Sequence, residues 1–130
     1  MSWRRVHAIR GATTVDRDEP EAILAATREL LETLVCRNSL GTDEVVSAIF
    51  SVTPDLTTEF PARAARGLGW DAVALFCATE MQVPHAPERC IRVLLHIECA
   101  APRAEVAHVY LREARHLRPE WGGMAGVAPA

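Results

Sequence analysis

The sequence predicts an α+β fold, a mixed sheet of about five strands with one long helix on one face and two short helices. Three observations predict it. Apolar residues recur at helical spacing over one long segment, residues 20–37. Several shorter segments are rich in Val and Ile or alternate between polar and apolar residues, as strands do. Finally, 130 residues with 49% hydrophobic and only 5% aromatic content suit one domain with an aliphatic core.

The first two predicted elements are a short strand and the long helix. Val6–Gly11 alternates so that Arg10 and Ile9 point to opposite faces, and a glycine ends it. Acidic residues and the first-turn Pro20 then begin a helix that continues to about Arg37. Its inward stripe comprises Ile23, Leu24, Thr27, Leu30, Leu31, Leu34 and Val35.

A second strand and a short helix follow. Periodicity alone leaves Val45–Val52 open between helix and strand. Its Val, Ile and Phe content and the stop at Pro54 favour a strand, at least from Ser47. The segment Phe60–Gly67 is predicted to be a short helix closed by its glycine.

The remaining segments complete the sheet. Ala72–Cys77 and Ile91–Cys99 are clear apolar strands. Pro102–Val109 has the composition of a second short helix, and Tyr110–Leu117 is assigned to a returning strand although its residues also favour helix. Because one long helix covers only one sheet face, the other face needs a partner, and we expect oligomerisation.

The organisation is a single domain, residues 1–121, followed by a flexible Gly- and Ala-rich tail, residues 122–130. No apolar run approaches the ~18 residues of a membrane span, and the basic N-terminus lacks an apolar stretch after it. We therefore predict a cytoplasmic protein with no membrane partner. A net charge of −3 without a basic run also argues against nucleic acid as a partner.

The motifs of metal and nucleophilic chemistry are missing from the sequence. The four cysteines form no C-x-x-C pair and have no matching histidine spacing, so buried free thiols are favoured over zinc or disulfides. There is no H-E-x-x-H, no Ser/His/Asp order and no Gly-rich phosphate loop. We expect neither a metal nor a cofactor.

Arginine is the informative residue type. All 14 basic residues are arginine, which we attribute mainly to genomic composition. Placement says more: Arg92 stands in a very apolar strand, where an unpaired guanidinium costs several kcal/mol. It either reaches water at the strand end or awaits an anionic ligand, and Arg10, at the end of another strand, allows the same two interpretations. From its sequence position alone, Glu80 is interpreted as a solvated loop acid. Cys77 is interpreted in the same way as a core thiol.

Five motifs resemble those of one enzyme family. From about Val6 to Pro119, they have the order and spacing of the monofunctional, trimeric α/β-type (Bacillus-type) chorismate mutases. The motifs are Ile9–Val15 (IRGATTV), Thr53–Leu56 (TPDL), Phe60–Ala62 (FPA), Cys90–Val93 (CIRV), and His108–Leu111 (HVYL) with Leu117–Pro119 (LRP).

The resemblance implies a fold, an assembly and a reaction. The family has a mixed five-stranded sheet with a long helix on one face, and three subunits join into a pseudo-α/β barrel with active sites at their interfaces. Its members convert chorismate to prephenate, without a cofactor, in phenylalanine and tyrosine biosynthesis. The homotrimer agrees with the uncovered sheet face inferred above.

The resemblance also assigns roles by position. Arg92 is expected to hold the ether oxygen and a carboxylate of chorismate. Arg10 and Tyr110 are expected to bind the enolpyruvyl carboxylate, and Glu80 and Cys77 to meet the ring hydroxyl.

Other positions are expected to form the walls of the pocket. One wall is Phe76, Cys77, Ala78 and Thr79. The neighbouring subunit is expected to contribute Phe60, Ala62, Arg63 and Arg66, with Leu117 and Arg118 from a C-terminal stretch that helps to cover the pocket. Two residues depart from the family pattern: Phe76 replaces a small polar residue, and Arg63 replaces a lysine.

Two alternative functions remain open at this point. A non-catalytic trimeric sensor of an aromatic or carboxylate metabolite would also use Arg10 and Arg92. The imine-hydrolysing trimers have a similar barrel-like architecture and an interface arginine, but their sequence motifs do not match.

Overall fold

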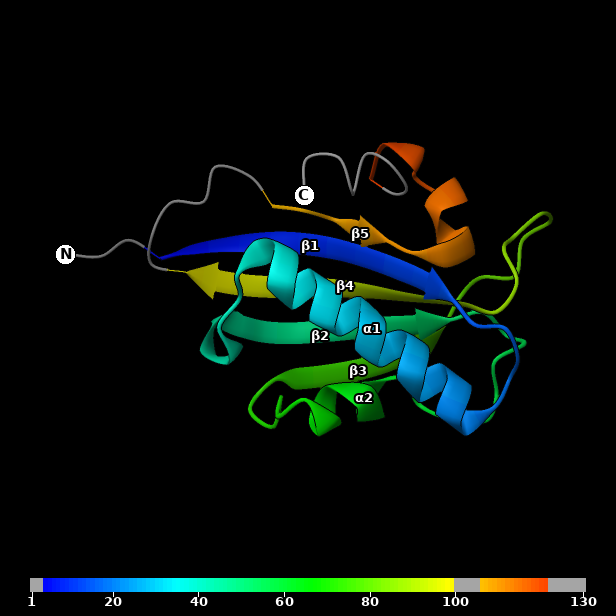
Figure 1. Cartoon of the computed structure of the whole chain (residues 1–130), viewed down its shortest axis with the longest axis horizontal. Helices are drawn as coiled ribbons and strands as arrows, with labels where there is room; N and C mark the ends of the chain where they lie inside the picture. Colours follow the sequence, from blue (N-terminus) through cyan, green and yellow to red (C-terminus); the bar gives the residue numbers. More distant parts are fainter. Residues whose placement is uncertain (1–3, 100–105, 122–130) are drawn as a thin grey trace.

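The computed structural model describes residues 4–99 and 106–121. Figure 1 shows its elements along the chain. They are β1 (Arg5–Thr14), α1 (Pro20–Asn38), β2 (Val45–Val52), α2 (Ala62–Gly67), β3 (Ala74–Thr79), β4 (Cys90–Cys99) and β5 (Val109–Tyr110), with 3₁₀ turns at Thr42–Glu44, Arg112–His116 and Pro119–Trp121.

The strands form one five-stranded mixed sheet in the order β3-β2-β4-β1-β5. The central strand β4 runs antiparallel to both β1 and β2. The two outer strands are parallel to their neighbours, β3 to β2 and β5 to β1. The predicted fold class is thus confirmed.

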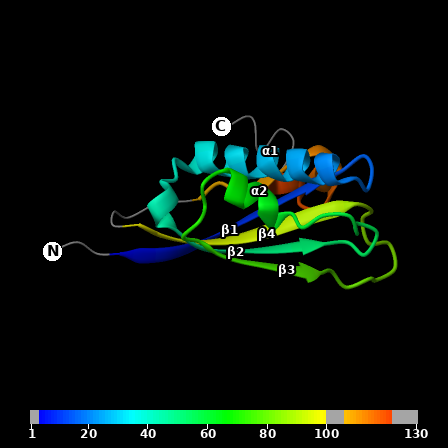
Figure 2. The ribbon, with the colours of Figure 1, turned by 90° about the horizontal axis from the view of Figure 1, so that it is seen from below.

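Both α-helices lie on the same face of the sheet (Figure 2). The hydrophobic core lies between these two layers. Alternate residues of β4 face the helices: Val93, Leu95 and Ile97 are at most 3% exposed and pack in one cluster with the apolar stripe of α1. Of the predicted stripe, Ile23, Thr27, Leu30, Leu31 and Leu34 are buried, whereas Leu24 and Val35 are only half-buried.

A glycine allows α1 to approach the sheet closely. A Cβ added to Gly11 would lie 3.0 Å from Leu34 Cδ1 and 3.2 Å from both Leu30 Cδ1 and Val93 Cγ1.

The prediction that Gly11 ends the first strand is wrong, because β1 continues to Thr14. Arg10, placed at a strand end by the sequence, lies in the middle of β1 opposite Leu94.

The last third of the described chain differs most from prediction. The strand predicted at Tyr110–Leu117 is wrong: β5 is only Val109–Tyr110, and residues 112–116 form a 3₁₀ turn. The chain leaves the sheet where Arg112 takes a φ of 53°, a left-handed conformation that ends extended structure. Residues 106–108 are not helical, so the helix predicted to reach Val109 is wrong there.

The rest of that predicted helix, residues 102–105, and the predicted tail, residues 122–130, lie outside the described residues. The β3 strand begins two residues later than predicted, at Ala74. Within the described chain, every helix is too short or too polar to cross a membrane.

Candidate active site

Arg92 lies on the face of the sheet that the α-helices leave open. It is the third residue of β4, opposite Ala12 of β1 and Ser51 of β2. Its neighbours Ile91 and Val93 are buried on the helix side, so alternation turns the Arg92 side chain to the open face. This side chain is only 30% exposed. Among the described residues, its buried Nε atom has no hydrogen-bond acceptor.

Glu80 is held beside Arg92 by two contacts. Directly after β3, its backbone N–H donates to the Val52 carbonyl at 2.8 Å. Its Oε2 atom accepts a hydrogen bond from the Ser51 hydroxyl at 2.5 Å and lies 3.4 Å from Arg92 Nε. The guanidinium therefore has one fixed carboxylate neighbour and unused donor capacity. The sequence analysis missed Ser51, because only the β2–β4 register places it opposite Arg92.

The charge of Arg92 also reaches Cys90. Burial raises the pKa of the Cys90 thiol, although the nearby guanidinium opposes this effect. The thiol is thus kept protonated and unreactive at neutral pH. Cys90 and Cys99 are buried, as the sequence analysis favoured for cysteine. Cys77 is half-buried and Cys36 is exposed, so the expectation of a buried thiol is wrong for Cys36.

Arg10 and Tyr110 lie on the same open face, two register positions apart. Tyr110 pairs with Ala12, and both are buried in a small cluster with Ala114 that the half-buried Leu117 joins. The 3₁₀ turn therefore covers the β5 end of the open face. The structure thus brings Arg10, Tyr110 and Leu117, all predicted site residues, into one neighbourhood of a single chain.

His108, to which the sequence analysis gave no role, contacts Arg10 directly. Its Nδ1 atom accepts a hydrogen bond from the Arg10 backbone N–H at 3.0 Å. Burial, followed by the positive charges of Arg10 and Arg118, lowers the pKa of His108. A neutral imidazole is therefore favoured beside Arg10, a predicted substrate-binding residue, and Arg118, predicted to help cover the pocket.

A second group of predicted site residues lines a cavity of about 270 Å³ at the β3 edge. Phe60 lies there with the β3 residues predicted to form the wall beside the ring hydroxyl. The lining comprises Val52, Leu56, Thr57, Thr58, Glu59, Phe60, Pro61, Cys77, Ala78 and Thr79. The cavity does not contain Arg92 or Glu80.

One carboxylate fixes the loop that carries Phe60. Asp18 accepts hydrogen bonds from the backbone N–H groups and the hydroxyls of both Thr57 and Thr58, at 2.8–3.2 Å. These contacts join the start of the long-helix segment to the cavity wall. The sequence offered no signal for them, since the partners are about 40 positions apart.

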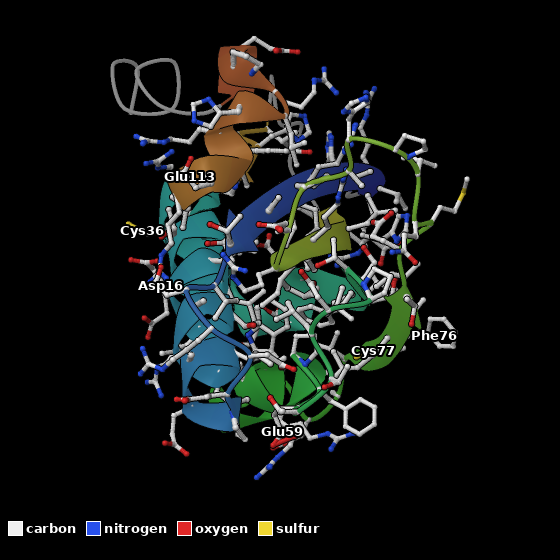
Figure 3. The ribbon with its side chains drawn as sticks, turned by 90° about the vertical axis from the view of Figure 1, so that its right-hand side faces the viewer. Asp16, Cys36, Glu59, Phe76, Cys77 and Glu113 are labelled. Carbon is white, nitrogen blue, oxygen red and sulfur yellow. The ribbon has the colours of Figure 1, made fainter. Side chains whose placement is uncertain are left out.

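The Arg92 group (Arg92, Glu80 and Ser51) and the residues that line the Phe60 cavity lie on opposite sides of the sheet. Cys77 packs against the helix-side core, whereas Arg92 faces the open side. The structure therefore does not bring the Cys77 thiol to Glu80 and Arg92 within one chain. The ring of Phe76, 63% exposed, projects away from the ribbon in Figure 3.

The other predicted residues lie outside these contacts. Ala62 is buried in the core, and Arg66 is exposed at the end of α2. Arg63 forms an ion pair with Glu59 one turn earlier, and Arg118 lies 2.7 Å from Glu120. Within the described chain, no three His, Cys, Asp or Glu side chains gather as metal ligands.

The comparisons with known proteins agree with each other. The family model described as chorismate mutase type I matches residues 6–121. The chain is 42% identical to the chorismate mutase AroH of Bacillus subtilis over 116 residues, 88% of this chain and 91% of that protein. It is 49% identical to the AroH protein of Thermus thermophilus, covering 88% and 95% of the two chains.

The similarity extends to a solved structure. A chorismate mutase from Clostridium thermocellum superposes with a TM-score of 0.81 at 44% identity, covering 85% of this chain and 98% of that one. The family match, over residues 6–121, includes both helices and the residues around Arg92. The chain therefore belongs to the type I chorismate mutase family.

Proposed function

We propose that this protein is a chorismate mutase, an isomerase that converts chorismate to prephenate in aromatic amino acid biosynthesis. The family match and two relatives named for this activity, at 42% and 49% identity, carry the proposal. They give no support to the sensor alternative.

The reaction explains why the site needs no catalytic acid–base pair. In this unimolecular rearrangement one C–O bond breaks while one C–C bond forms, and no proton moves. A protein can accelerate it by holding the flexible dicarboxylate in a compact conformer. It can also stabilise the negative charge that grows on the ether oxygen.

Arg92 is our candidate for that electrostatic role. Its side chain is mostly buried in a strand with apolar neighbours, and its Nε atom finds no hydrogen-bond acceptor among the described residues. Such a donor is already oriented and largely desolvated, so it interacts strongly with developing charge without reorganising. The ether oxygen of chorismate is the acceptor that we assign to it.

Glu80 has two roles in the proposed site. It keeps the Arg92 guanidinium oriented through the 3.4 Å ion pair, while Ser51 fixes the shared Oε2 atom. Its other carboxylate oxygen is assigned to the ring hydroxyl of the substrate. Arg10 and Tyr110, on the same face, are assigned to the enolpyruvyl carboxylate.

We further propose that the enzyme is a homotrimer whose sites are completed between subunits. Two features support this assembly. The open sheet face exposes the large apolar side chains of Ile49 and Phe76, 40% and 63% exposed. The Phe60 cavity and the Arg92 group lie on opposite sides of one sheet, so the cavity wall of one copy could meet the open face of the next.

We also place the enzyme in the cytoplasm. Cys36, Cys77 and Cys90 form no disulfide, which supports a reducing compartment, since oxidising compartments favour disulfides. We propose that the enzyme uses neither a metal nor a cofactor.

Incubation of the purified protein with chorismate, followed by ultraviolet absorbance, tests the function. We expect a saturable loss of chorismate with prephenate as product. Arg92→Ala should slow turnover by about 10²–10³-fold, the usual cost of removing one preorganised donor. Arg92→Lys should also be slow, because an ammonium cannot contact two acceptors in the guanidinium geometry.

The matched control is Arg28→Ala, which removes an exposed arginine paired with Glu32 on α1 and should leave turnover unchanged. Binding of chorismate without turnover by the wild type would contradict the enzyme assignment. Near-normal turnover of Arg92→Ala would instead reject only the role of Arg92.

A further inference from the structure

His108 occupies the point where the β1–β5 ladder ends. The two strands pair in parallel at Gly11 with Val109 and at Ala12 with Tyr110. One residue earlier, the imidazole takes the place of a strand partner and accepts the Arg10 backbone N–H at 3.0 Å. This side-chain contact joins residues 98 positions apart and fixes the backbone of Arg10.

Only one form of the imidazole can make this bond. Nδ1 accepts a hydrogen bond only when it carries no proton, so the ring must be neutral with its proton on Nε2. Among the described residues, the charges that bear on the ring are those of Arg10 on β1 and Arg118 after the 3₁₀ turn. Both are positive and oppose an imidazolium.

We propose that His108 is a positioning residue, whose neutral imidazole holds the Arg10 backbone so that the guanidinium is directed at the substrate carboxylate. The proposal rests on the proposed function, because it takes Arg10 to be a substrate-binding residue. Protonation of His108 would remove the acceptor and add a third positive charge between two arginines. Arg10 would then lose its fixed position.

This arrangement predicts a pH dependence that the chemical step does not have. The rearrangement transfers no proton. A fall of kcat/KM at acid pH, called the acid limb below, must therefore come from groups that bind or position the substrate. The pKa of His108 is lowered by burial and by both arginines, which places its protonation below the ordinary value of 6.5. Carboxylates of the substrate stay ionised until about pH 4. The acid limb assigned to His108 therefore lies below pH 6.5.

Two substitutions separate the acceptor from the titrating ring. His108→Leu removes the acceptor, whereas His108→Asn offers Oδ1 at the same number of bonds from Cα and cannot titrate. At pH 7.5 we expect His108→Leu to raise KM about threefold to tenfold with a smaller effect on kcat, as loss of one positioning hydrogen bond implies. His108→Asn should stay within about twofold of wild type.

As the pH is lowered from 8 through 6.5 and below, kcat/KM of the wild type should fall, and His108→Asn should remove that fall. His116→Leu is the matched control, because this histidine side chain is 76% exposed on the 3₁₀ turn. It should keep both KM and the acid limb. An unchanged KM in a folded His108→Leu, or an acid limb that persists in His108→Asn, would overturn the proposal.

A measurement that does not depend on activity completes the test. The ¹⁵N chemical shifts of the His108 ring at pH 7.5 should show a proton on Nε2 and a bare Nδ1. A proton on Nδ1 would overturn the proposal even if His108→Leu failed to fold. A wild type that does not consume chorismate would instead reject the proposed function, and the ring tautomer would still report on the Arg10 contact.

Discussion

The two faces of the sheet differ most clearly along β4, where they alternate residue by residue. On the helix side, Ile91, Val93, Leu95 and Ile97 are 0–3% exposed. On the open side, Arg92, Leu94, His96 and Glu98 are all only half-buried. The first face holds the fold together, and the second presents the polar groups of the site. Because one strand contributes to both, stability and activity should be separable by substitutions one residue apart.

The largest stability effect is expected on the covered face, from Leu95→Ala. Leu95 is fully buried in the main core cluster, so its truncation leaves a cavity that the sheet cannot close. We expect a loss of about 2–5 kcal/mol in the free energy of unfolding. Denaturant titration at fixed protein concentration measures it, with Val83→Ala, 49% exposed in a loop, as the control. A loss as small as the control's would contradict the assignment of this face as the core.

A smaller loss is expected from the opposite change, Gly11→Ala. The new methyl group would meet three side-chain carbons at 3.0–3.2 Å, so α1 or β4 must shift to admit it. Overpacking of this kind costs about 1–3 kcal/mol. Gly67→Ala is the matched control, because a Cβ there meets nothing within 4 Å. Equal unfolding curves for the two variants would show that helix and sheet are less closely packed than this geometry indicates.

On the open face, Ile49→Asp should affect assembly rather than the fold of one chain. Ile49 is 40% exposed here, so a carboxylate is tolerated in the single chain. In the proposed trimer the same carboxylate loses water without gaining a partner. We expect association to weaken at least about tenfold, seen by sedimentation, with an unchanged circular dichroism spectrum. A wild type that sediments as a stable monomer would reject the trimer itself.

The sequence predicted the covered face better than the open one, for a physical reason. Burial leaves a periodic pattern, so the α1 stripe and the apolar strands were found from residue spacing alone. Short elements without such a pattern were misassigned. The segment after Tyr110 packs through one alanine, Ala114, and its 3₁₀ turn follows from backbone geometry at Arg112.

The site shows the same limit. Arg92 was identified because a cation in an apolar strand is anomalous at the level of sequence. Its neighbour Ser51 meets it only through the β2–β4 register. Glu80, directly after β3, was placed in the site by the family resemblance and not by residue spacing. Long-range contacts of this kind leave no local signal, and Asp18 and His108 were missed for the same reason.

Asp18 provides the smallest predicted effect and the clearest test of the cavity side. Although burial opposes the shift, hydrogen bonds from Thr57 and Thr58 lower the pKa of this carboxyl. A depressed pKa means that the contact is complete above the unfolded value near 3.8 and is lost as pH falls through the lower folded value. At neutral pH the Phe60 loop is therefore fixed.

Asp18→Ala frees the loop without touching the core or Arg92. We expect KM for chorismate to rise about twofold to fivefold, from the loss of positioning hydrogen bonds, with kcat nearly unchanged. Asp16→Ala, an exposed acid two residues earlier, should change neither constant. A fall in kcat with constant KM would mean that the loop acts in the chemical step, and the division between a binding wall and a reactive open face would then be wrong.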